Sequence, residues 1–155
     1  MKILFVCLGN ICRSPLAEGI FQKLLAENGL AEKVKVDSAG TSAYHIGELP
    51  DYRTRQIAEK YGITLTHRAR QVRKTDFEEF DYILAADSSN LNHLKSLQNP
   101  HSKAKLHLIR NWEGNNLDVP DPYYGTMQDF EEGYQILSKA LQLFLENLKQ
   151  ELSEC

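Results

Sequence analysis

An apolar run, a short loop and a helix start follow one another at the N-terminus of this 155-residue chain. Residues 3–6 are all apolar and predict a buried strand, and Gly9-Asn10 within residues 7–13 predicts a tight loop. Ser14-Pro15 predicts the helix start, because a serine hydroxyl can cap a free backbone N–H and proline has no N–H to lose. The loop should therefore lie at the carboxyl end of a strand, where α/β folds bind ligands.

The rest of the chain alternates between expected helices and strands. Further strands are expected at residues 33–37, 81–86 and 106–109, with a break at residues 38–41. Helices are expected from Ser14 to Asn28-Gly29, over residues 50–61, through Leu91, Leu94 and Leu97 after the strand at residues 81–86, and over residues 127–152. Residues 112–125 predict a long, functional loop. The alternation predicts one α/β domain over residues 1–155, with a parallel sheet covered on both faces.

The net charge and the hydropathy of the chain argue against two classes of binding partner, nucleic acids and membranes. The net charge of −3, with both signs mixed along the chain, argues against nucleic acid as a partner. No apolar stretch reaches membrane-spanning length, and residues 3–6 are too short a run for a secretory signal. We therefore expect a cytoplasmic protein that binds neither nucleic acid nor membrane and that acts on small molecules or on proteins.

The first loop carries a thiol, five intervening residues, a guanidinium and a hydroxyl, at Cys7, Arg13 and Ser14. A loop of this length can turn its backbone N–H groups inward and continue into a helix N-terminus, which favours a bound anion. The positive field of these N–H groups and of the helix N-terminus also stabilises a thiolate, so Cys7 is expected to be a nucleophile. Arg13 is expected to hold phosphate through two parallel donors. The alternative for Cys7 is a small buried residue that closes the strand.

The chain has three cysteines, an odd number, and is too long to need a disulfide scaffold. Cys12 lies close enough in the loop to form a reversible disulfide with Cys7 on oxidation, which would protect the nucleophile. The alternative for Cys12 is a thiol that fills the loop and has no redox role. Cys155 is expected to be a frayed terminal thiol.

A reaction through cysteinyl phosphate also needs an acid for the leaving oxygen and a base for water, and one carboxyl can serve both steps. Asp121 is the best candidate, because Pro122 stiffens its loop and Tyr123 and Tyr124 can form the wall of a deep pocket. Asp-Pro is also a common start of a turn. The acids that remain as alternatives are Asp37, Asp51, Asp87 and Asp118.

Taken together, the segments 7–14 and 121–124 resemble the phosphate loop and the acid loop of the low-molecular-weight protein tyrosine phosphatases. Segments 37–42, 50–53, 67–71 and 80–84 also resemble this family, in the family's order, so the resemblance covers nearly the whole chain. It implies a doubly wound, four-stranded parallel sheet, no cofactor and no metal. It also implies a metal-independent, two-step hydrolysis of phosphotyrosine proteins or small aryl phosphates. We expect a monomer, in which exposed tyrosines on the pocket rim could serve either substrate binding or a weak self-association.

The resemblance assigns roles residue by residue. It makes Cys7 the nucleophile, Arg13 the phosphate clamp and Asp121 the acid, with Ser14 donating to the thiolate. The phosphate loop and its supports are expected to be Leu8, Gly9, Asn10, Ile11, Cys12, Ser14, Ser38 and His67. Without the resemblance, Asn10 would be explained by a left-handed turn, Ser38 by a turn cap and His67 by a solvated loop.

Substrate choice is expected to depend on apolar pocket walls, for which the candidates are Leu8, Ile11, Tyr44, Tyr123 and Tyr124. Tyr44 stands where eukaryotic-type relatives carry an aromatic residue, which favours phosphotyrosine, although it could be an ordinary exposed loop tyrosine. The basic run at residues 67–74 could attract acidic peptides, but such a run is more often a solvated face.

Three alternative functions are weighed against phosphotyrosine hydrolysis. Protein-arginine phosphatases resemble this chain but carry threonine where Ile11 stands. Arsenate reductases of this fold need additional cysteines after the central strand, and residues 85–100 contain none. A phosphotyrosine-binding module without catalysis would be expected to lose the thiol or the acid, whereas both are present.

Overall fold

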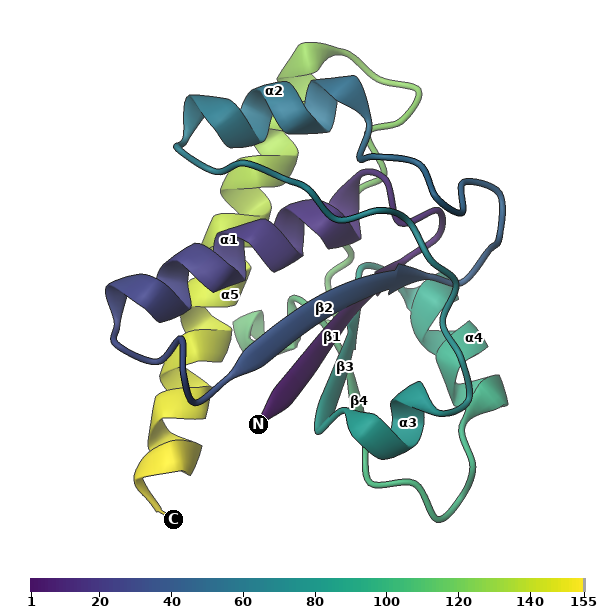
Figure 1. Cartoon of the computed structure of the whole chain (residues 1–155), viewed down its shortest axis with the longest axis vertical. Helices are drawn as coiled ribbons and strands as arrows, with labels where there is room; N and C mark the ends of the chain where they lie inside the picture. Colours follow the sequence, from purple (N-terminus) through teal and green to yellow (C-terminus); the bar gives the residue numbers. More distant parts are fainter. Residues whose placement is uncertain (155) are drawn as a thin grey trace.

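A four-stranded parallel sheet lies at the centre of the computed structural model, which describes residues 1–154. Its strands lie in the order β2-β1-β3-β4 (Figure 1). Val6 of β1 is paired with Ala39 of β2 on one side and with Ala85 of β3 on the other. The loop that follows β1 therefore leaves the sheet between two neighbouring strands. The strands are β1 (Lys2–Cys7), β2 (Lys35–Gly40), β3 (Tyr82–Ala85) and β4 (Lys105–Leu108).

Helices cover both faces of this sheet. α1 and α5 lie on one face and α3 and α4 on the other, while α2 packs against α1 and α5 (Figure 1). This arrangement confirms the expected doubly wound α/β fold. The helical elements are α1 (Arg13–Glu27), α2 (Tyr52–Lys60), α3 (Asp76–Glu79), α4 (Ser88–Leu97), the 3₁₀ turn η1 (Asn111–Glu113) and α5 (Met127–Ser153).

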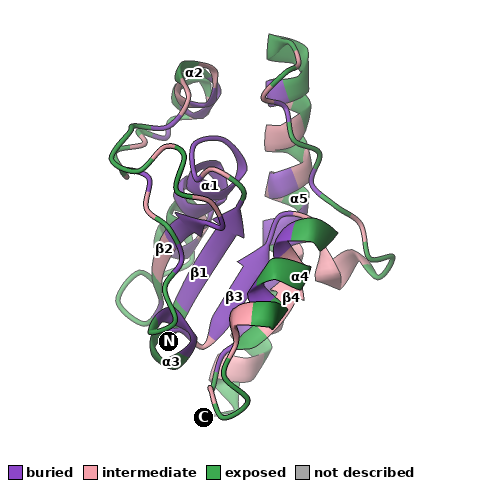
Figure 2. Ribbon diagram, turned by 90° about the vertical axis from the view of Figure 1, so that its right-hand side faces the viewer, coloured by how far each residue is buried: buried purple, intermediate pink, exposed green. Residues whose placement is uncertain are grey.

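The central strand β1 has no exposed face. Phe5 packs with Phe21 of α1, at 5.8 Å between ring centroids, in the cluster that also holds Phe144 of α5. Its neighbours Leu4 and Val6 lie in the second cluster, under α3 and α4. β3, and β1 beyond Lys2, are accordingly buried, whereas the edge strands β2 and β4 begin with exposed and half-buried residues (Figure 2). Burying each such side chain contributes about 1.5–3 kcal/mol to the stability of the fold. The packing of β1 therefore fixes the position of the loop at its end.

The expected start of the first helix was wrong. α1 begins at Arg13, its N-cap is Cys12, and no side chain caps it. The hydroxyl of Ser14 instead lies 3.0 Å from Sγ of Cys7. The serine that sequence reasoning placed as a cap therefore faces the catalytic candidate.

The expected break after the second strand was also wrong. β2 continues to Gly40 because Ser38, Ala39 and Gly40 keep their pairing with β1. The four-residue helix α3 was not expected, since it is too short to show a periodic pattern. Cys155 and the expectation for its thiol lie outside the described residues. Within residues 1–154, no helix combines the length and the apolar character needed to cross a membrane.

Candidate active site

The loop between β1 and α1 turns its carbonyl groups outward. The carbonyl oxygens of Cys7, Leu8 and Ile11 accept hydrogen bonds of 2.9, 2.9 and 2.7 Å from backbone N–H groups of residues 41, 42 and 51, outside the loop. The backbone N–H groups of residues 8–12 donate to no acceptor within residues 1–154. Free N–H groups that precede a helix N-terminus favour a bound anion.

Asn10 holds this loop in shape with both its backbone and its side chain. Its φ of 58° is left-handed, a conformation that asparagine tolerates better than most residues. Its Oδ1 accepts from the backbone N–H of Arg70 and from Nε2 of His67, each at 3.0 Å. Its Nδ2 donates to Ser14 at 2.8 Å and to Ser38 at 3.0 Å. The two roles that the sequence left as alternatives therefore occur together.

Gly40 lets the loop approach β2 closely. A Cβ atom at this position would lie 2.7 Å from the carbonyl oxygen of Leu8, which is shorter than any normal contact. Because the neighbouring atom is backbone and cannot rotate away, any larger residue would displace the loop.

Two candidate catalytic groups, Cys7 and Arg13, lie at this loop, and a third, Asp121, approaches Arg13 from another part of the chain. The exposed fraction is 2% for Cys7 and 4% for Arg13. Nη1 of Arg13 donates to Asp87 at 2.7 Å and to the carbonyl of Val119 at 2.9 Å. Nη2 of Arg13 lies 3.7 Å from Oδ2 of Asp121. Burial lowers the pKa of Arg13, but nearby Cys7 and Asp87 raise it above its ordinary value. The guanidinium is therefore a fixed positive charge.

A pocket of about 180 Å³ opens over these groups. The residues that the sequence placed on its walls all line it, with Tyr44 at 80% exposure and Tyr124 at 96% on its rim. His45 also lines it, and no sequence signal pointed to that residue. The lining residues are Cys7, Leu8, Gly9, Ile11, Cys12, Arg13, Tyr44, His45, Asp121, Tyr123 and Tyr124.

The alternative acids have other partners and do not line the pocket. Asp37 pairs with Arg70, and Asp118 accepts from the backbone and the hydroxyl of Ser88. Asp87 caps α4 and holds Arg13, a role that sequence reasoning missed. The remaining alternative, Asp51, caps α2.

Cys12 differs from Cys7 in its surroundings. Burial, followed by the nearby carboxylate of Asp51, raises the pKa of the Cys12 thiol to about 12. Cys12 is therefore a neutral thiol at physiological pH. Both cysteines are free thiols in the structure, and a disulfide between them on oxidation stays a prediction.

Arg53 ties the acid loop to the start of α2, and sequence reasoning gave it no role. Its Nη2 donates to the carbonyl of Tyr123 at 2.9 Å and to Asp51 at 3.1 Å. Its guanidinium also lies 4.4 Å from the centre of the Phe130 ring. These contacts hold the backbone two residues beyond Asp121.

Behind the loop, Glu18, Asp37 and His67 gather with Ser38 between them and Asn10. Ser38 donates to Glu18 at 2.6 Å, and Nδ1 of His67 lies 3.3 Å from Asp37 and 3.6 Å from Glu18. Atoms of Glu18, Asp37 and His67 that could bind a metal lie within 4.8 Å of one another. The carboxylates already accept from protein donors, so this cluster is explained by its bracing of the loop.

Ionisation of the buried Glu18 should lower the stability of the fold. Burial, the largest effect, raises its pKa from 4.5 to about 7, so the folded chain binds a proton that the unfolded chain releases. The free energy of unfolding should therefore fall as pH rises from about 4.5 to about 7. We expect Glu18→Gln to raise the free energy of unfolding by about 1–3 kcal/mol at pH 8 and to change it little near pH 4.5. Urea unfolding at the two pH values measures this difference.

A loss of stability in Glu18→Gln at pH 8 would contradict this expectation. It would mean that the ionised carboxylate gains more from His67 and Arg70 than burial costs it. The pKa of His67 is itself lowered by burial, against the opposing effect of Asp37.

Similar proteins share this fold over its full length. The family model of the low molecular weight phosphotyrosine protein phosphatases matches residues 2–154. A low molecular weight phosphotyrosine protein phosphatase of Gallus gallus is 48% identical over 148 residues, covering 94% of either chain. The crystal structure of a protein tyrosine phosphatase from Entamoeba histolytica, with Hepes in the active site, has a TM-score of 0.93 and 38% identity, covering 97% of this chain and 98% of that one.

A second function is represented among the similar structures. The crystal structure of a drosophila arginine phosphatase has a TM-score of 0.91 and 34% identity, and covers 96% of this chain and 98% of that one. The fold is therefore shared by phosphatases with different substrates. The match of the family model and the identity to curated relatives show that this chain belongs to the low molecular weight phosphotyrosine protein phosphatase family.

Proposed function

We propose that this chain is a protein tyrosine phosphatase that hydrolyses phosphotyrosine monoesters through a phosphocysteine intermediate. One observation carries the proposal: the thiol of Cys7, the guanidinium of Arg13 and the carboxyl of Asp121 line a single pocket at the end of β1. The names of the curated relatives support the same reaction.

In the first step, the thiolate of Cys7 attacks phosphorus and the bond to the phenolic oxygen breaks. Asp121 donates a proton to that oxygen, so tyrosine leaves as a neutral phenol. The N–H groups of residues 8–12 and Arg13 hold the phosphoryl oxygens, because catalysis of phosphoryl transfer consists mainly of positioning and charge stabilisation. Because Asn10 donates to the Ser14 oxygen, the one hydroxyl hydrogen of Ser14 has two acceptors within reach, the carbonyl of Ala39 at 3.3 Å and Sγ of Cys7 at 3.0 Å. Turned toward Cys7, this hydrogen stabilises the thiolate.

In the second step, water attacks the phosphorus of phosphocysteine while Asp121, now ionised, accepts a proton from it. The S–P bond breaks, phosphate leaves, and Cys7 returns to the thiolate. Asp121 is well placed for both transfers, because its side chain is 44% exposed at the mouth of the pocket and is aligned by the backbone N–H of Tyr123 at 3.1 Å. One carboxyl therefore serves as acid and then as base.

The pocket walls suit a phenyl ester. Leu8, Ile11, Tyr44 and Tyr123 present apolar and aromatic surface around the thiol, against which a phenyl ring can pack. We expect phosphotyrosine peptides to be hydrolysed with a kcat/KM at least about 100-fold above that of matched phosphoserine peptides, whose short side chain cannot bring phosphate to the floor. Phosphate release from paired peptides measures the ratio, and comparable rates would contradict the assignment.

Arginine phosphatase is the second candidate, because one similar structure has that activity. Ile11 argues against it, since its side chain adds an apolar wall to the pocket where a phosphorylated guanidinium would need polar partners. Hydrolysis of phosphoarginine peptides in the same assay separates the two candidates. A preference for phosphoarginine would leave the nucleophile in place and overturn the substrate assignment.

The anchoring of the acid loop gives a further prediction. We expect Arg53→Gln to lower kcat about 10-fold with little change in KM, because Asp121 loses its fixed position while Cys7 and Arg13 keep theirs. The loss should be larger for phenyl phosphate than for 4-nitrophenyl phosphate, whose leaving oxygen needs less protonation. Arg73→Gln, a change at an exposed arginine outside the pocket, is the control. A rise in KM with unchanged kcat would contradict this role.

A further inference from the structure

A groove of about 400 Å³ opens beside the catalytic pocket. It shares Ile11, His45 and Tyr123 with that pocket as walls, so the two hollows are neighbours. We call its outer part the arginine groove, which is lined by Leu49, Pro50, Tyr52, Arg55 and Arg68. A peptide whose phosphotyrosine occupies the pocket would extend its neighbouring residues over this groove, since an extended chain advances about 3.3 Å per residue.

Of the two carboxylates in the groove, one is paired with an arginine. Asp51 accepts three hydrogen bonds from Arg53, at 2.8, 3.1 and 3.1 Å, which outweigh its burial and lower its pKa. Glu48 lies 2.9 Å from Nδ1 of His45, a contact that is an ion pair only when the imidazole is protonated. With a neutral His45, Glu48 contributes one negative charge to the groove.

The two arginines of the groove have no such partner. Among residues 1–154, neither Arg55 nor Arg68 forms a salt bridge with a carboxylate, although Arg53 and Arg70 beside them both do. Since Asp51 is paired with Arg53, the two charges of Arg55 and Arg68 outnumber the one charge of Glu48, and the groove has a net positive charge. Arg68 also belongs to the basic run that the sequence singled out at residues 67–74, which places part of that run beside the catalytic pocket.

Both guanidinium groups are held in position by the same short segment. Nε of Arg55 donates to the carbonyl of Pro50 at 3.0 Å, and Nη1 of Arg68 donates to the carbonyl of Gly47 at 2.9 Å. Arg55 also lies 5.8 Å from the ring centre of Tyr52. A guanidinium has five N–H donors, so most of them remain for a ligand. A carboxylate is the group that such planar, pre-positioned donors bind best in a peptide.

We propose that the arginine groove binds an acidic side chain near the phosphotyrosine of a protein substrate. The preferred substrates are then phosphotyrosine segments with aspartate or glutamate within a few residues of the phosphorylated position. The inference rests on the proposed function and adds the class of peptide that the site selects. Its ligand is the carboxylate of a peptide, bound by Arg55 and Arg68 and packed along Tyr52 and Leu49.

The test compares peptides that carry one phosphotyrosine and a single glutamate or glutamine at each of the three positions before and after it. For the wild type, we expect kcat/KM to be about threefold to tenfold higher with glutamate at the position that reaches the groove, an effect that weakens at high salt. The double variant Arg55→Gln/Arg68→Gln should lose this preference. It should hydrolyse 4-nitrophenyl phosphate, which does not reach the groove, at the wild-type rate.

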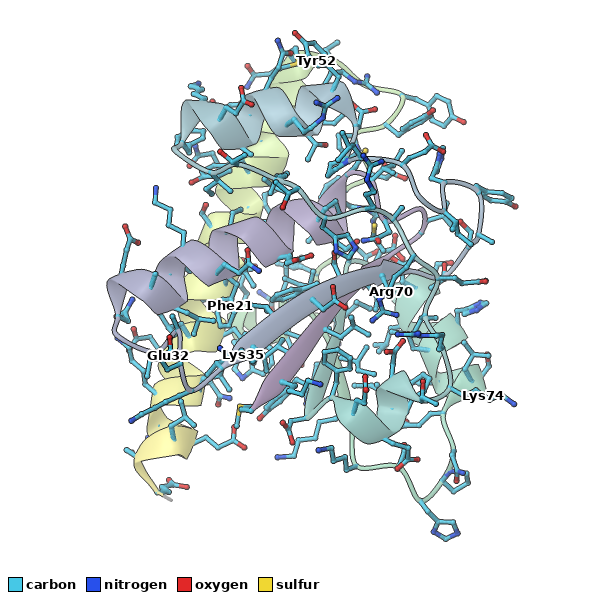
Figure 3. All side chains as sticks on the ribbon, viewed as in Figure 1. Phe21, Glu32, Lys35, Tyr52, Arg70 and Lys74 are labelled. Carbon is cyan, nitrogen blue, oxygen red and sulfur yellow. The ribbon has the colours of Figure 1, made fainter. Side chains whose placement is uncertain are left out.

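Lys74→Gln is the control for charge and is compared with the single variants Arg55→Gln and Arg68→Gln, because each of the three removes one positive charge. It removes one positive charge from a different groove, and Figure 3 shows Lys74 at the lower right of the molecule and Tyr52 at its top. The control should keep the preference for glutamate, which separates a local site from a general effect of net charge.

Three results would overturn the inference. The wild type could show no preference at any position, the double variant could keep the preference, or Lys74→Gln could lose it equally. In each case, continued hydrolysis of 4-nitrophenyl phosphate would leave the proposed function standing. If the wild type hydrolysed neither 4-nitrophenyl phosphate nor any phosphotyrosine peptide, the proposed function would fail and the inference with it.

Discussion

Cys7→Ser should lower kcat for 4-nitrophenyl phosphate by at least about 10⁴-fold, because loss of the nucleophile in a covalent mechanism removes nearly all catalysis. A serine hydroxyl has the size to fit beside Ser14 but is not ionised in the field of Arg13. The free N–H groups of residues 8–12 and the fixed charge of Arg13 remain, so the variant should still bind inorganic phosphate. Steady-state kinetics and calorimetric titration with phosphate measure the two expectations separately.

Cys12→Ser is the matched comparison, since it makes the same change in the same loop. Its thiol is held neutral by a pKa of about 12 and cannot supply the nucleophile. The loss in Cys12→Ser should therefore be at least 100-fold smaller than the loss in Cys7→Ser. Equal losses would show that the reaction depends on the loop's structure and not on one thiolate, and would contradict the assignment of Cys7.

Asp121→Asn should produce the second largest loss, about 10²–10⁴-fold in kcat for phenyl phosphate. Asparagine keeps the oxygen that accepts from the backbone N–H of Tyr123, but it cannot give a proton to the phenolic oxygen. Because nitrophenol leaves without protonation, its phosphate ester should suffer less in this step. The ratio of the losses for the two esters, measured across pH, reports the proton transfer directly.

Asp118→Asn serves as the control for Asp121. Asp118 lies in the same long loop, but its Oδ1 accepts from Ser88 and it does not line the pocket. Asparagine can still accept those hydrogen bonds, so kcat should stay within about twofold of the wild type. A loss that matched Asp121→Asn, with the same dependence on the leaving group, would move the acid to Asp118.

Local patterns were sufficient to predict the main elements of the fold. The uninterrupted apolar run at residues 3–6 and the helical spacing in residues 127–152 identify their elements from neighbouring residues alone. The errors occurred where contacts outside the local helix or strand pattern decide the outcome. Ser14 has the composition of a cap, yet its hydroxyl turns to Cys7, and Ser38 to Gly40 extend β2 only because β1 lies beside them.

The candidate site likewise contains some residues whose roles could be predicted from the sequence and others whose roles could not. The thiol, the arginine and the loop length stand next to one another in the sequence, so their chemistry could be predicted. Asp87 accepts from Arg13, which lies 74 residues away in the sequence, and Arg53 donates to the carbonyl of Tyr123, which lies 70 residues away. A single sequence carries no sign of either contact. The pairing of charges in the arginine groove likewise depends on which carboxylates have partners, and only the structure provides that information.

The central position of β1 also ties enzymatic activity to the completion of folding. The loop at its end is braced by β2, by the start of α4 through Asp87, and by Val119, so groups from three distant parts of the chain must assemble before Arg13 is in place. Such long-range pairings form late because their loop-closure entropy must be paid first. During refolding, activity should therefore return together with burial of the core and not before it, and a nascent chain that ended before residue 119 would expose an inert cysteine.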